Sequence, residues 1–314
     1  MSLSPMPHSD ISVNPLDVRP IAGSIGAEIH GLDLSSPLSA EVFDQIHAAF
    51  LDHLVLFFPH QSPLTPANLS AFASRFGEVD KAPFVYPFKV PSEPGFPEVY
   101  NNIKEAGSRT TNIGGFWHAD VTYRVRPHLC SVLYAKDVPT FGGDTMFANQ
   151  YLAYETLPDD VKERVSKMKA VHSSTMIHGQ SAPRIASVSR DHIPNAGDES
   201  IETHKDHVIK GEPNVVENLH PVVRVHPDTG RKLLYVNRGF TSRFDSMSVD
   251  DSLPLLEYLW HHATRAEFTC RYRWRPHDVT VWDNRAVHHY AINDYFGHAR
   301  HMQRIAVHEP VRPY

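Results

Sequence analysis

Two residues of different types, separated by a single position, carry the clearest chemical signal in this chain. The segment 116–123 has the sequence FWHADVTY, with His118 and Asp120 at alternate positions. In an extended chain, side chains two positions apart face the same side, so an imidazole and a carboxylate can reach one metal ion together. Completed by a distant second histidine, this pair forms the facial triad of non-haem iron(II) oxygenases. On its own the pattern is weak, because an H-x-D pair can equally be a surface or capping pair.

Other reactive residue types give no competing site. The chain has two cysteines, Cys130 and Cys270, too few for a disulfide framework or a cysteine zinc cluster. We find no convincing serine, cysteine and histidine nucleophile pattern. We therefore expect no catalytic side chain beyond a metal centre.

Composition and charge exclude several classes of protein. The 314 residues are 41% apolar and 21% charged, and the formal net charge is −6. No block of lysine and arginine stands out, so neither nucleic acid nor an anionic membrane surface is an expected partner. The first twenty residues lack the pattern of a secretory signal, and no run approaches the roughly 18 apolar residues of a membrane helix. We expect a cytoplasmic protein and leave its oligomeric state open, a homo-oligomer included.

The candidate residues must be positioned by a largely β-structured frame. Short β-like runs dominate the chain from about residue 97 onward, and no regular βαβ alternation appears. Many short strands with a few helices favour a sandwich or jelly roll with helical cover. The expected strands are 26–34, 54–58, 98–101, 128–136, 145–148, 222–226, 233–237, 267–274, 279–282 and 303–308.

Helices are expected where caps precede apolar stripes. Ser39 can cap a helix with Phe43, Ile46 and Phe50 on one face, and Thr65 can cap another that ends near Gly77. Further helical patterns cover about 150–168 and 249–264, and Ser248 can cap the latter. Residues 178–218 are polar and lack periodicity, which is typical of either a functional lid or a disordered excursion. We treat residues 1–314 as one domain carrying a mobile active-site insertion at 178–218.

Two later segments make a family resemblance specific. One is the sequence FGGDTMF at 141–147, and the other is WDNRAVHHY at 282–290, followed by Arg300 and Arg304. Together with the sequence around His118, they resemble the taurine dioxygenase/TfdA-like family of iron(II), 2-oxoglutarate enzymes. The likeness runs from about residue 26 to Arg304. It implies a mainly β fold with flanking helices, a double-stranded β-helix or jelly roll.

The resemblance implies how the metal and co-substrate would be held. His118, Asp120 and His289 would bind Fe(2+), with His288 the rival for the last position, since adjacent strand residues face opposite sides. Thr145 and Arg300, which is eleven residues after His289, would hold 2-oxoglutarate. A planar guanidinium suits the distal carboxylate of that co-substrate better than an ammonium does.

The same resemblance implies the reaction and leaves the substrate partly open. The enzyme would use O2 to hydroxylate a small anionic organic substrate next to a heteroatom, with succinate and CO2 as co-products. Arg304 and Tyr86 would bind a sulfonate, an alkyl sulfate ester or an aryloxyalkanoate. Taurine itself is disfavoured, because Pro83 and Gly114 stand where taurine enzymes carry a histidine and an asparagine.

Three alternatives to these assignments stay open on the residues alone. The jelly roll could be a non-catalytic sensor of iron or 2-oxoglutarate, or the three ligands could hold zinc in a hydrolase. Arg300 and Arg304 could be surface ion-pair partners, which contribute little. Asp283 and Arg285 are expected to organise a strand end rather than act on substrate. His172, His178, His204 and His207 are expected to be loop histidines and not a second metal site.

Overall fold

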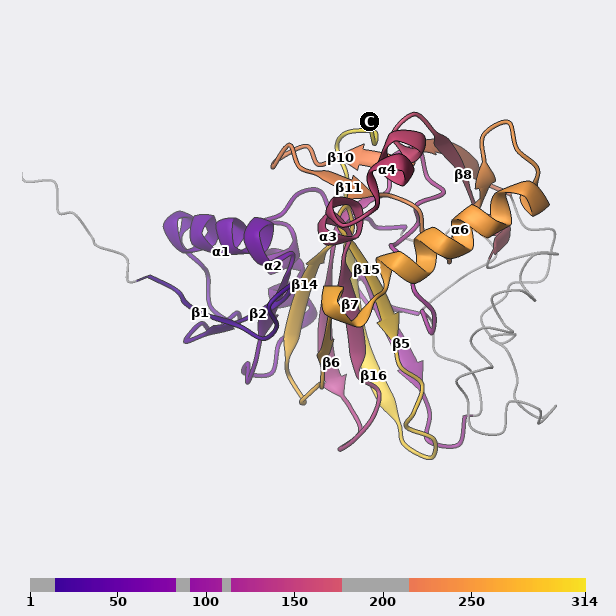
Figure 1. The fold of residues 1–314 in the computed structure, drawn as a ribbon. Coiled ribbons are helices and arrows are strands. Elements are labelled where there is room, and N and C mark those ends of the chain that lie inside the picture. Colours follow the sequence, from indigo (N-terminus) through magenta and orange to yellow (C-terminus); the bar gives the residue numbers. More distant parts are fainter. Residues whose placement is uncertain (1–14, 83–90, 109–113, 177–214) are drawn as a thin grey trace, which may run out of the picture.

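A computed structural model describes residues 15–82, 91–108, 114–176 and 215–314. Its frame is an eight-stranded sheet in the order β1-β2-β3-β14-β6-β16-β5-β4, with a three-stranded sheet, β13-β7-β15, beside it. Figure 1 shows strands β7 and β15 alongside β6, β14 and β16. A second three-stranded sheet has the order β12-β8-β9, and β10 pairs with β11. The prediction of a mainly β fold with flanking helices is confirmed.

The strands of the large sheet are β1 (Asp17–Pro20), β2 (Ala27–His30), β3 (Val55–Phe58), β4 (Ser92–Glu93), β5 (Phe96–Lys104), β6 (His128–Asp137), β14 (Val279–Asp283) and β16 (Arg300–His308). The smaller sheets contain β7 (Thr145–Asn149), β8 (Lys169–Ser173), β9 (Glu217–Pro221), β10 (Val223–Val225), β11 (Lys232–Leu234), β12 (Thr241–Phe244), β13 (Thr269–Tyr272) and β15 (Val287–Ala291). Helices are α1 (Ala40–His53), α2 (Pro66–Ala73), α3 (Gln150–Glu155), α4 (Asp159–Val165) and α6 (Val249–Ala263), with 3-10 turns η1 (Ser174–Met176) and η3 (Ala266–Phe268).

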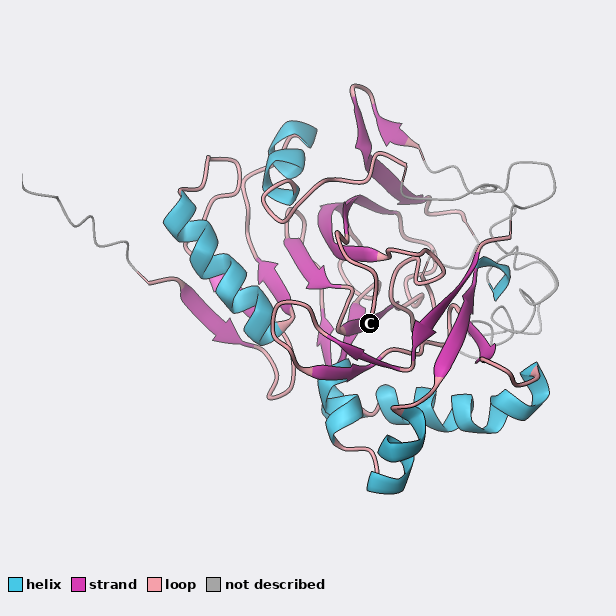
Figure 2. Cartoon of the chain, turned by 90° about the horizontal axis from the view of Figure 1, so that it is seen from above, coloured by secondary structure: helices cyan, strands magenta, loops and turns pink. Residues whose placement is uncertain are grey.

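The helices begin at the predicted caps and lie outside the strands. The side chains of Ser39 and Thr65 accept backbone N–H groups at the starts of α1 and α2, and Ser248 does the same for α6. Such a cap contributes about 1 kcal/mol. Seen from above, the helices flank the strands at the periphery (Figure 2). No helix in the described part of the chain is long and apolar enough to cross a bilayer.

Alternation along the large sheet separates two apolar cores. Val281 and Ile305 face one cluster that also contains Ile46 and Phe50 of α1. The neighbouring strand residues Trp282 and Met302 face the other cluster, which includes Phe147 of β7. Because successive side chains alternate, strands β3, β6, β14 and β16 each contribute to both cores. The second core lies between the two sheets, and it borders the candidate site.

Several boundaries differ from the predictions for local reasons. The predicted helix at 150–168 is two helices, α3 and α4, because Pro158 stands at the N-terminal cap of the second. The predicted strand 233–237 ends at Leu234, and Asn237 instead accepts the N–H of Phe240 in a turn. The helix predicted to end near Gly77 ends at Ala73.

Part of the notable sequence lies outside the described residues. Tyr86 and Pro83 fall there, as do residues 178–214 of the predicted insertion, so their roles stay predictions. The last two residues of the predicted insertion, Glu217 and Asn218, begin strand β9. The regular structure therefore resumes before the predicted end of the insertion.

Candidate metal centre

Three side chains from two distant segments meet in the interior with their ligand atoms together. His118, Asp120 and His289 are all buried, and their ligand atoms lie within 4.8 Å of one another. Oδ1 of Asp120 lies 3.7 Å from Nε2 of His118 and 3.7 Å from Nε2 of His289. The two imidazole centroids are 4.1 Å apart. Two imidazole nitrogens and one carboxylate oxygen at these separations can bind a divalent metal ion from one side.

Backbone pairing brings the two histidines together. The N–H of His289 donates to the carbonyl of His118 over 2.7 Å, and the reverse bond is 3.1 Å. Residues directly opposite in an antiparallel pair place their side chains on the same face. The segment is a single bridge that enters a turn at Asp120 and not the extended strand assumed above, and Val121 has a φ of 45°. Asp120 therefore meets His118 at the start of a turn.

Both histidine rings are in the neutral form, in which a ring nitrogen can bind a metal ion. Nδ1 of His118 donates to the carbonyl of Phe116 over 2.8 Å, which leaves Nε2 facing Asp120. Burial lowers the pKa of His118 to about 4 and holds the pKa of His289 well below its ordinary value. Both imidazoles are thus neutral near pH 7, as metal binding requires. An outer hydrogen bond of the kind made by His118 also fixes the orientation of a ligand ring.

The neighbouring histidines of the second motif face opposite ways. His289 contacts the inner residues Trp282 and Phe147, with ring centroids 4.7 and 6.4 Å away. His288 faces the outer side of β15 and lines a separate cavity. The structure therefore places His289, and not its rival His288, beside His118 and Asp120.

The carboxylate of Asp120 is held by residues of the large sheet. Ser131 Oγ donates to Oδ2 of Asp120 over 2.9 Å and accepts a 3.0 Å hydrogen bond from Nδ2 of Asn284. Oδ1 of Asn284 accepts the indole N–H of Trp282 at 2.9 Å and the backbone N–H of Asp120 at 3.4 Å. These bonds occupy Oδ2 and leave Oδ1 directed toward the two imidazoles.

Arg300 is a buried cation whose charge is not fully neutralised by neighbouring residues. Its guanidinium is buried, its Nε has no hydrogen-bond partner, and its interactions with Tyr295 and Asp144 only partly offset the burial that lowers its pKa. Lys104 is directly opposite Arg300 on β5 and is also buried. Burial, followed by the charge of Arg300, lowers the pKa of Lys104 to about 8. Two adjacent buried cations create a site suited to a carboxylate.

Thr145 is held by a residue that motif reading did not identify. The indole N–H of Trp274 donates to Oγ1 of Thr145 over 3.0 Å. The hydroxyl proton of Thr145 therefore remains available for an acceptor. The glycine turn before Thr145 lies next to Arg300, because an added Cβ at Gly143 would be 3.4 Å from Cδ of Arg300. Thr145 and Arg300 are therefore on the same side of the site.

Arg304 is on the inner face with Arg300 and Met302, as predicted, and it reaches the metal centre. Its Nη2 donates to Oδ2 of Asp120 and, over 2.8 Å, to Oγ of Ser131. The guanidinium is buried, and its Nε has no hydrogen-bond partner. Neither Arg300 nor Arg304 is a surface ion-pair partner, which removes that alternative.

Gly114 has a conformational reason for replacing a larger residue. Its φ is +76°, which favours glycine, and an added Cβ would lie 2.9 Å from Cε1 of His118. An asparagine at this place would have a strained backbone, and the His118 ring or the backbone would have to move. Glycine at position 114, in place of the asparagine of taurine enzymes, therefore allows this segment to pack closely against the His118 ring.

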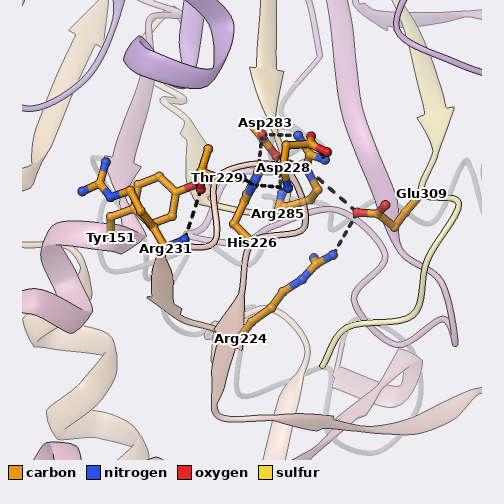
Figure 3. Close-up of polar contacts among 9 residues, drawn as sticks. All are labelled: Tyr151, Arg224, His226, Asp228, Thr229, Arg231, Asp283, Arg285 and Glu309. Carbon is orange, nitrogen blue, oxygen red and sulfur yellow. Dashed lines mark hydrogen bonds and ion pairs between the residues drawn. The ribbon is translucent and has the colours of Figure 1, made fainter. Parts of the chain in front are cut away.

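A buried charge network closes the end of β14, as expected for Asp283 and Arg285. Asp283 is fully buried, and it accepts from Arg285 at 2.7 Å and from His226 at 3.0 Å (Figure 3). Glu309 accepts from Arg224 at 2.8 Å in the same network. These bonds fix the turn that follows β14. They orient Asn284 inward without contacting the triad.

Sequence reasoning missed Ser131, Asn284, Trp274 and Lys104. Asn284 lies within the motif WDNRAVHHY, so its place in that motif could have indicated a role near the metal centre. Ser131 and Lys104 reach the site only through strand register, which single-sequence patterns do not specify. Trp274 lies just beyond the end of β13, and its contact with Thr145 likewise depends on the pairing of β13 with β7. His172, predicted above to be a loop histidine, is instead buried on strand β8, whereas His178, His204 and His207 lie outside the described residues.

Comparison with known proteins agrees with this geometry. Residues 17–306 match the family model described as "Taurine catabolism dioxygenase TauD, TfdA family". An "Alpha-ketoglutarate-dependent sulfate ester dioxygenase" of Pseudomonas putida is 36% identical over 292 residues, covering 93% of this chain and 89% of its own. An "Alkylsulfatase" of Acinetobacter baylyi is also 36% identical over 292 residues, covering 93% and 84%. A crystal structure titled as a putative alpha-ketoglutarate-dependent taurine dioxygenase from Burkholderia xenovorans matches with a TM-score of 0.74 and 34% identity, covering 95% and 94% of the two chains.

Proposed function

Because this chain belongs to the TauD/TfdA family of iron(II)- and 2-oxoglutarate-dependent dioxygenases, we propose that it oxidises alkyl sulfate esters. The family and the fold establish a taurine dioxygenase-like enzyme, which removes the sensor and zinc hydrolase alternatives. Two relatives at 36% identity, whose names refer to sulfate esters and alkyl sulfates, support this member of the predicted substrate classes.

We assign the metal and co-substrate contacts to the predicted residues. His118, Asp120 and His289 hold iron(II), and Arg300 with Thr145 binds the distal carboxylate of 2-oxoglutarate. The observation that best supports this assignment is that the ligand atoms of the three residues are buried close together. Two guanidinium groups that are not fully paired, those of Arg300 and Arg304, are buried in the same region. When bound, iron(II) with 2-oxoglutarate activates O2 for C–H hydroxylation and yields succinate and CO2.

Arg304 is assigned to the anionic sulfate group. Its Nη2 donates to Asp120 and Ser131, and its buried Nε has no acceptor among the described residues. A substrate held there places its sulfated carbon near the triad, because Arg304 itself touches Asp120. Tyr86 is the second proposed contact and lies outside the described residues.

Hydroxylation of the carbon that bears the sulfate oxygen accounts for the products. One oxygen atom of O2 enters the substrate C–H bond, and the other enters succinate. The resulting hydroxylated carbon loses sulfate as its C–O bond breaks, the hydroxyl proton departs, and an aldehyde remains. The net products are aldehyde, sulfate, a proton, succinate and CO2.

The test is succinate formation with iron(II), ascorbate and 2-oxoglutarate across alkyl sulfates, sulfonates and aryloxyalkanoates. We expect alkyl sulfates to give the highest kcat/KM, with sulfate and succinate released in equal amounts. Preference for a sulfonate or an aryloxyalkanoate would reject the substrate and retain the enzyme class. Turnover of uncharged substrates alone would reject the role of Arg304.

We also propose a reducing, cytoplasmic compartment, because both cysteines are buried and free. Fractionation of the source cells, with an antibody against the protein, tests this proposal.

A further inference from the structure

A cavity lies on the outer face of β15, the strand that carries His289. It has a volume of about 190 Å³ and is lined by Phe116, Trp117, Arg238, Trp260, His288 and Tyr290, among others. His288 and Tyr290 alternate with His289 along β15, so they face away from the metal centre. Trp117 packs against Tyr290, with ring centroids 5.7 Å apart. The cavity is therefore separated from the triad by the strand itself.

Arg238 gives this cavity a cationic wall. Its guanidinium lies over the ring of Trp260, 5.8 Å from the centroid. Within the described part of the chain, no carboxylate forms an ion pair with Arg238. Most other arginines near the interior of the fold have such a partner, as Arg285 and Arg224 do. A guanidinium without a carboxylate, placed at a concave aromatic wall, favours an anion.

His288 supplies a buried polar group without a partner. Its side chain lines the cavity and is 3% exposed, and neither ring nitrogen has a hydrogen-bond partner among the described residues. An imidazole can donate a hydrogen bond through one ring nitrogen and accept one through the other. A ligand in the cavity could therefore exchange a hydrogen bond with His288.

The walls and the volume limit the ligand to one small flat molecule. An apolar cavity of about 150 Å³ can bind benzene, so this cavity can accept a single ring with one small substituent. Trp117, Trp260 and Phe116 present aromatic surface on which such a ring would stack. The free cation requires the substituent to be negatively charged.

We infer that this cavity is a second ligand site, distinct from the metal centre, for a small aromatic monoanion of the benzoate type. Its charged group pairs with Arg238, its ring packs against Trp117 and Trp260, and His288 completes the hydrogen bonding. This inference does not depend on which substrate the enzyme oxidises. None of the residues that line the cavity belongs to the triad or is assigned to 2-oxoglutarate.

The experiment measures benzoate binding by calorimetry and saturation-transfer NMR on the full-length protein. The protein is loaded with iron(II), 2-oxoglutarate and an excess of an alkyl sulfate under anaerobic conditions, which occupies the central site. Arg238→Gln removes the cation from a half-exposed position. Arg265→Gln is the matched control, because Arg265 follows α6, is exposed and pairs with Glu267 instead of lining the cavity.

We expect one equivalent of benzoate to bind the loaded protein, with a dissociation constant at least tenfold larger for Arg238→Gln and unchanged for Arg265→Gln. Benzyl alcohol, which lacks the charge, should bind at least tenfold more weakly. Loss of benzoate binding on loading the central site would overturn the inference, as would equal binding by Arg238→Gln. If Arg238→Gln does not fold, the comparison of benzoate with benzyl alcohol on the wild-type protein decides.

Discussion

At the scale of residues, the metal centre depends on side chains that never touch the metal. Ser131 and Asn284 hold Oδ2 and the backbone N–H of Asp120, and Phe116 holds His118 through its carbonyl. Groups in this outer position orient metal ligands, and their loss typically weakens metal affinity by about 10–100-fold. They matter here because they hold Oδ2 of Asp120, which also accepts from Arg304, and so leave Oδ1 directed toward the two imidazoles.

Replacing Ser131 with alanine tests this outer layer. Ser131→Ala removes a donor to Asp120 and an acceptor for Asn284, so we expect the dissociation constant for iron(II) to rise by about 10–100-fold. Anaerobic titration calorimetry measures it. The matched control is Thr280→Val on neighbouring strand β14, whose buried hydroxyl has no hydrogen-bond partner. Equal affinity in Ser131→Ala and wild type would contradict the assigned role.

Arg300 provides a second residue-scale prediction. Arg300→Gln removes a buried charge-assisted contact, which should cost about 1.5–3 kcal/mol, so the KM for 2-oxoglutarate should rise by about 10–100-fold. Arg273→Gln, at an exposed arginine, serves as the control. Steady-state kinetics with varied 2-oxoglutarate measures both. An unchanged KM would assign the carboxylate to another cation, with Lys104 the first candidate.

At the scale of elements, local signals identified the starts of helices better than the partners of strands. Ser39, Thr65 and Ser248 were identified because a cap and its apolar stripe are adjacent in sequence. Strands β8, β9 and β12 were not predicted, since their pairing joins segments far apart in the chain. The triad was predictable from three motifs, whereas Ser131 required the register of β6 against β14.

The turn after β14 gives an element-scale prediction about stability. Asp283 is fully buried between Arg285 and His226, which hold its pKa well below the ordinary value. Asp283→Ala leaves these partners without their acceptor, so the free energy of unfolding should fall by about 3–5 kcal/mol. Urea denaturation measures the change.

Glu163→Ala is the control for that experiment, because its ion pair with Lys167 is exposed. Such pairs contribute about 0–1 kcal/mol, so the control should be nearly as stable as wild type. A comparable loss in both variants would show that the buried network does not stabilise the turn more than a surface pair does.

At the scale of the whole molecule, many buried histidines make stability depend on pH. Burial lowers the pKa of His220 to about 4 and holds the pKa of His172 well below its ordinary value of 6.5. The unfolded chain therefore binds more protons than the folded chain below pH 6.5, and the free energy of unfolding falls as the pH falls through that range.

We expect the free energy of unfolding to be lower at pH 5 than at pH 7.5. His220 alone should contribute about 2 kcal/mol of that loss. Urea denaturation at the two pH values measures it, and His220→Gln should show a smaller decline. Constant stability between these pH values would contradict the neutral state assigned to these buried rings.

The central claim is that His118, Asp120 and His289 form the iron site of a 2-oxoglutarate-dependent dioxygenase. The most direct measurement is the rate of succinate formation by the purified protein with iron(II), 2-oxoglutarate, O2 and an alkyl sulfate. We predict turnover that requires iron, is lost in His289→Ala and persists in His60→Asn, where an exposed histidine with a φ of 57° is replaced by a residue that tolerates this conformation. Undiminished succinate formation in His289→Ala, or none in the wild-type protein with any of the anionic substrates, would contradict it.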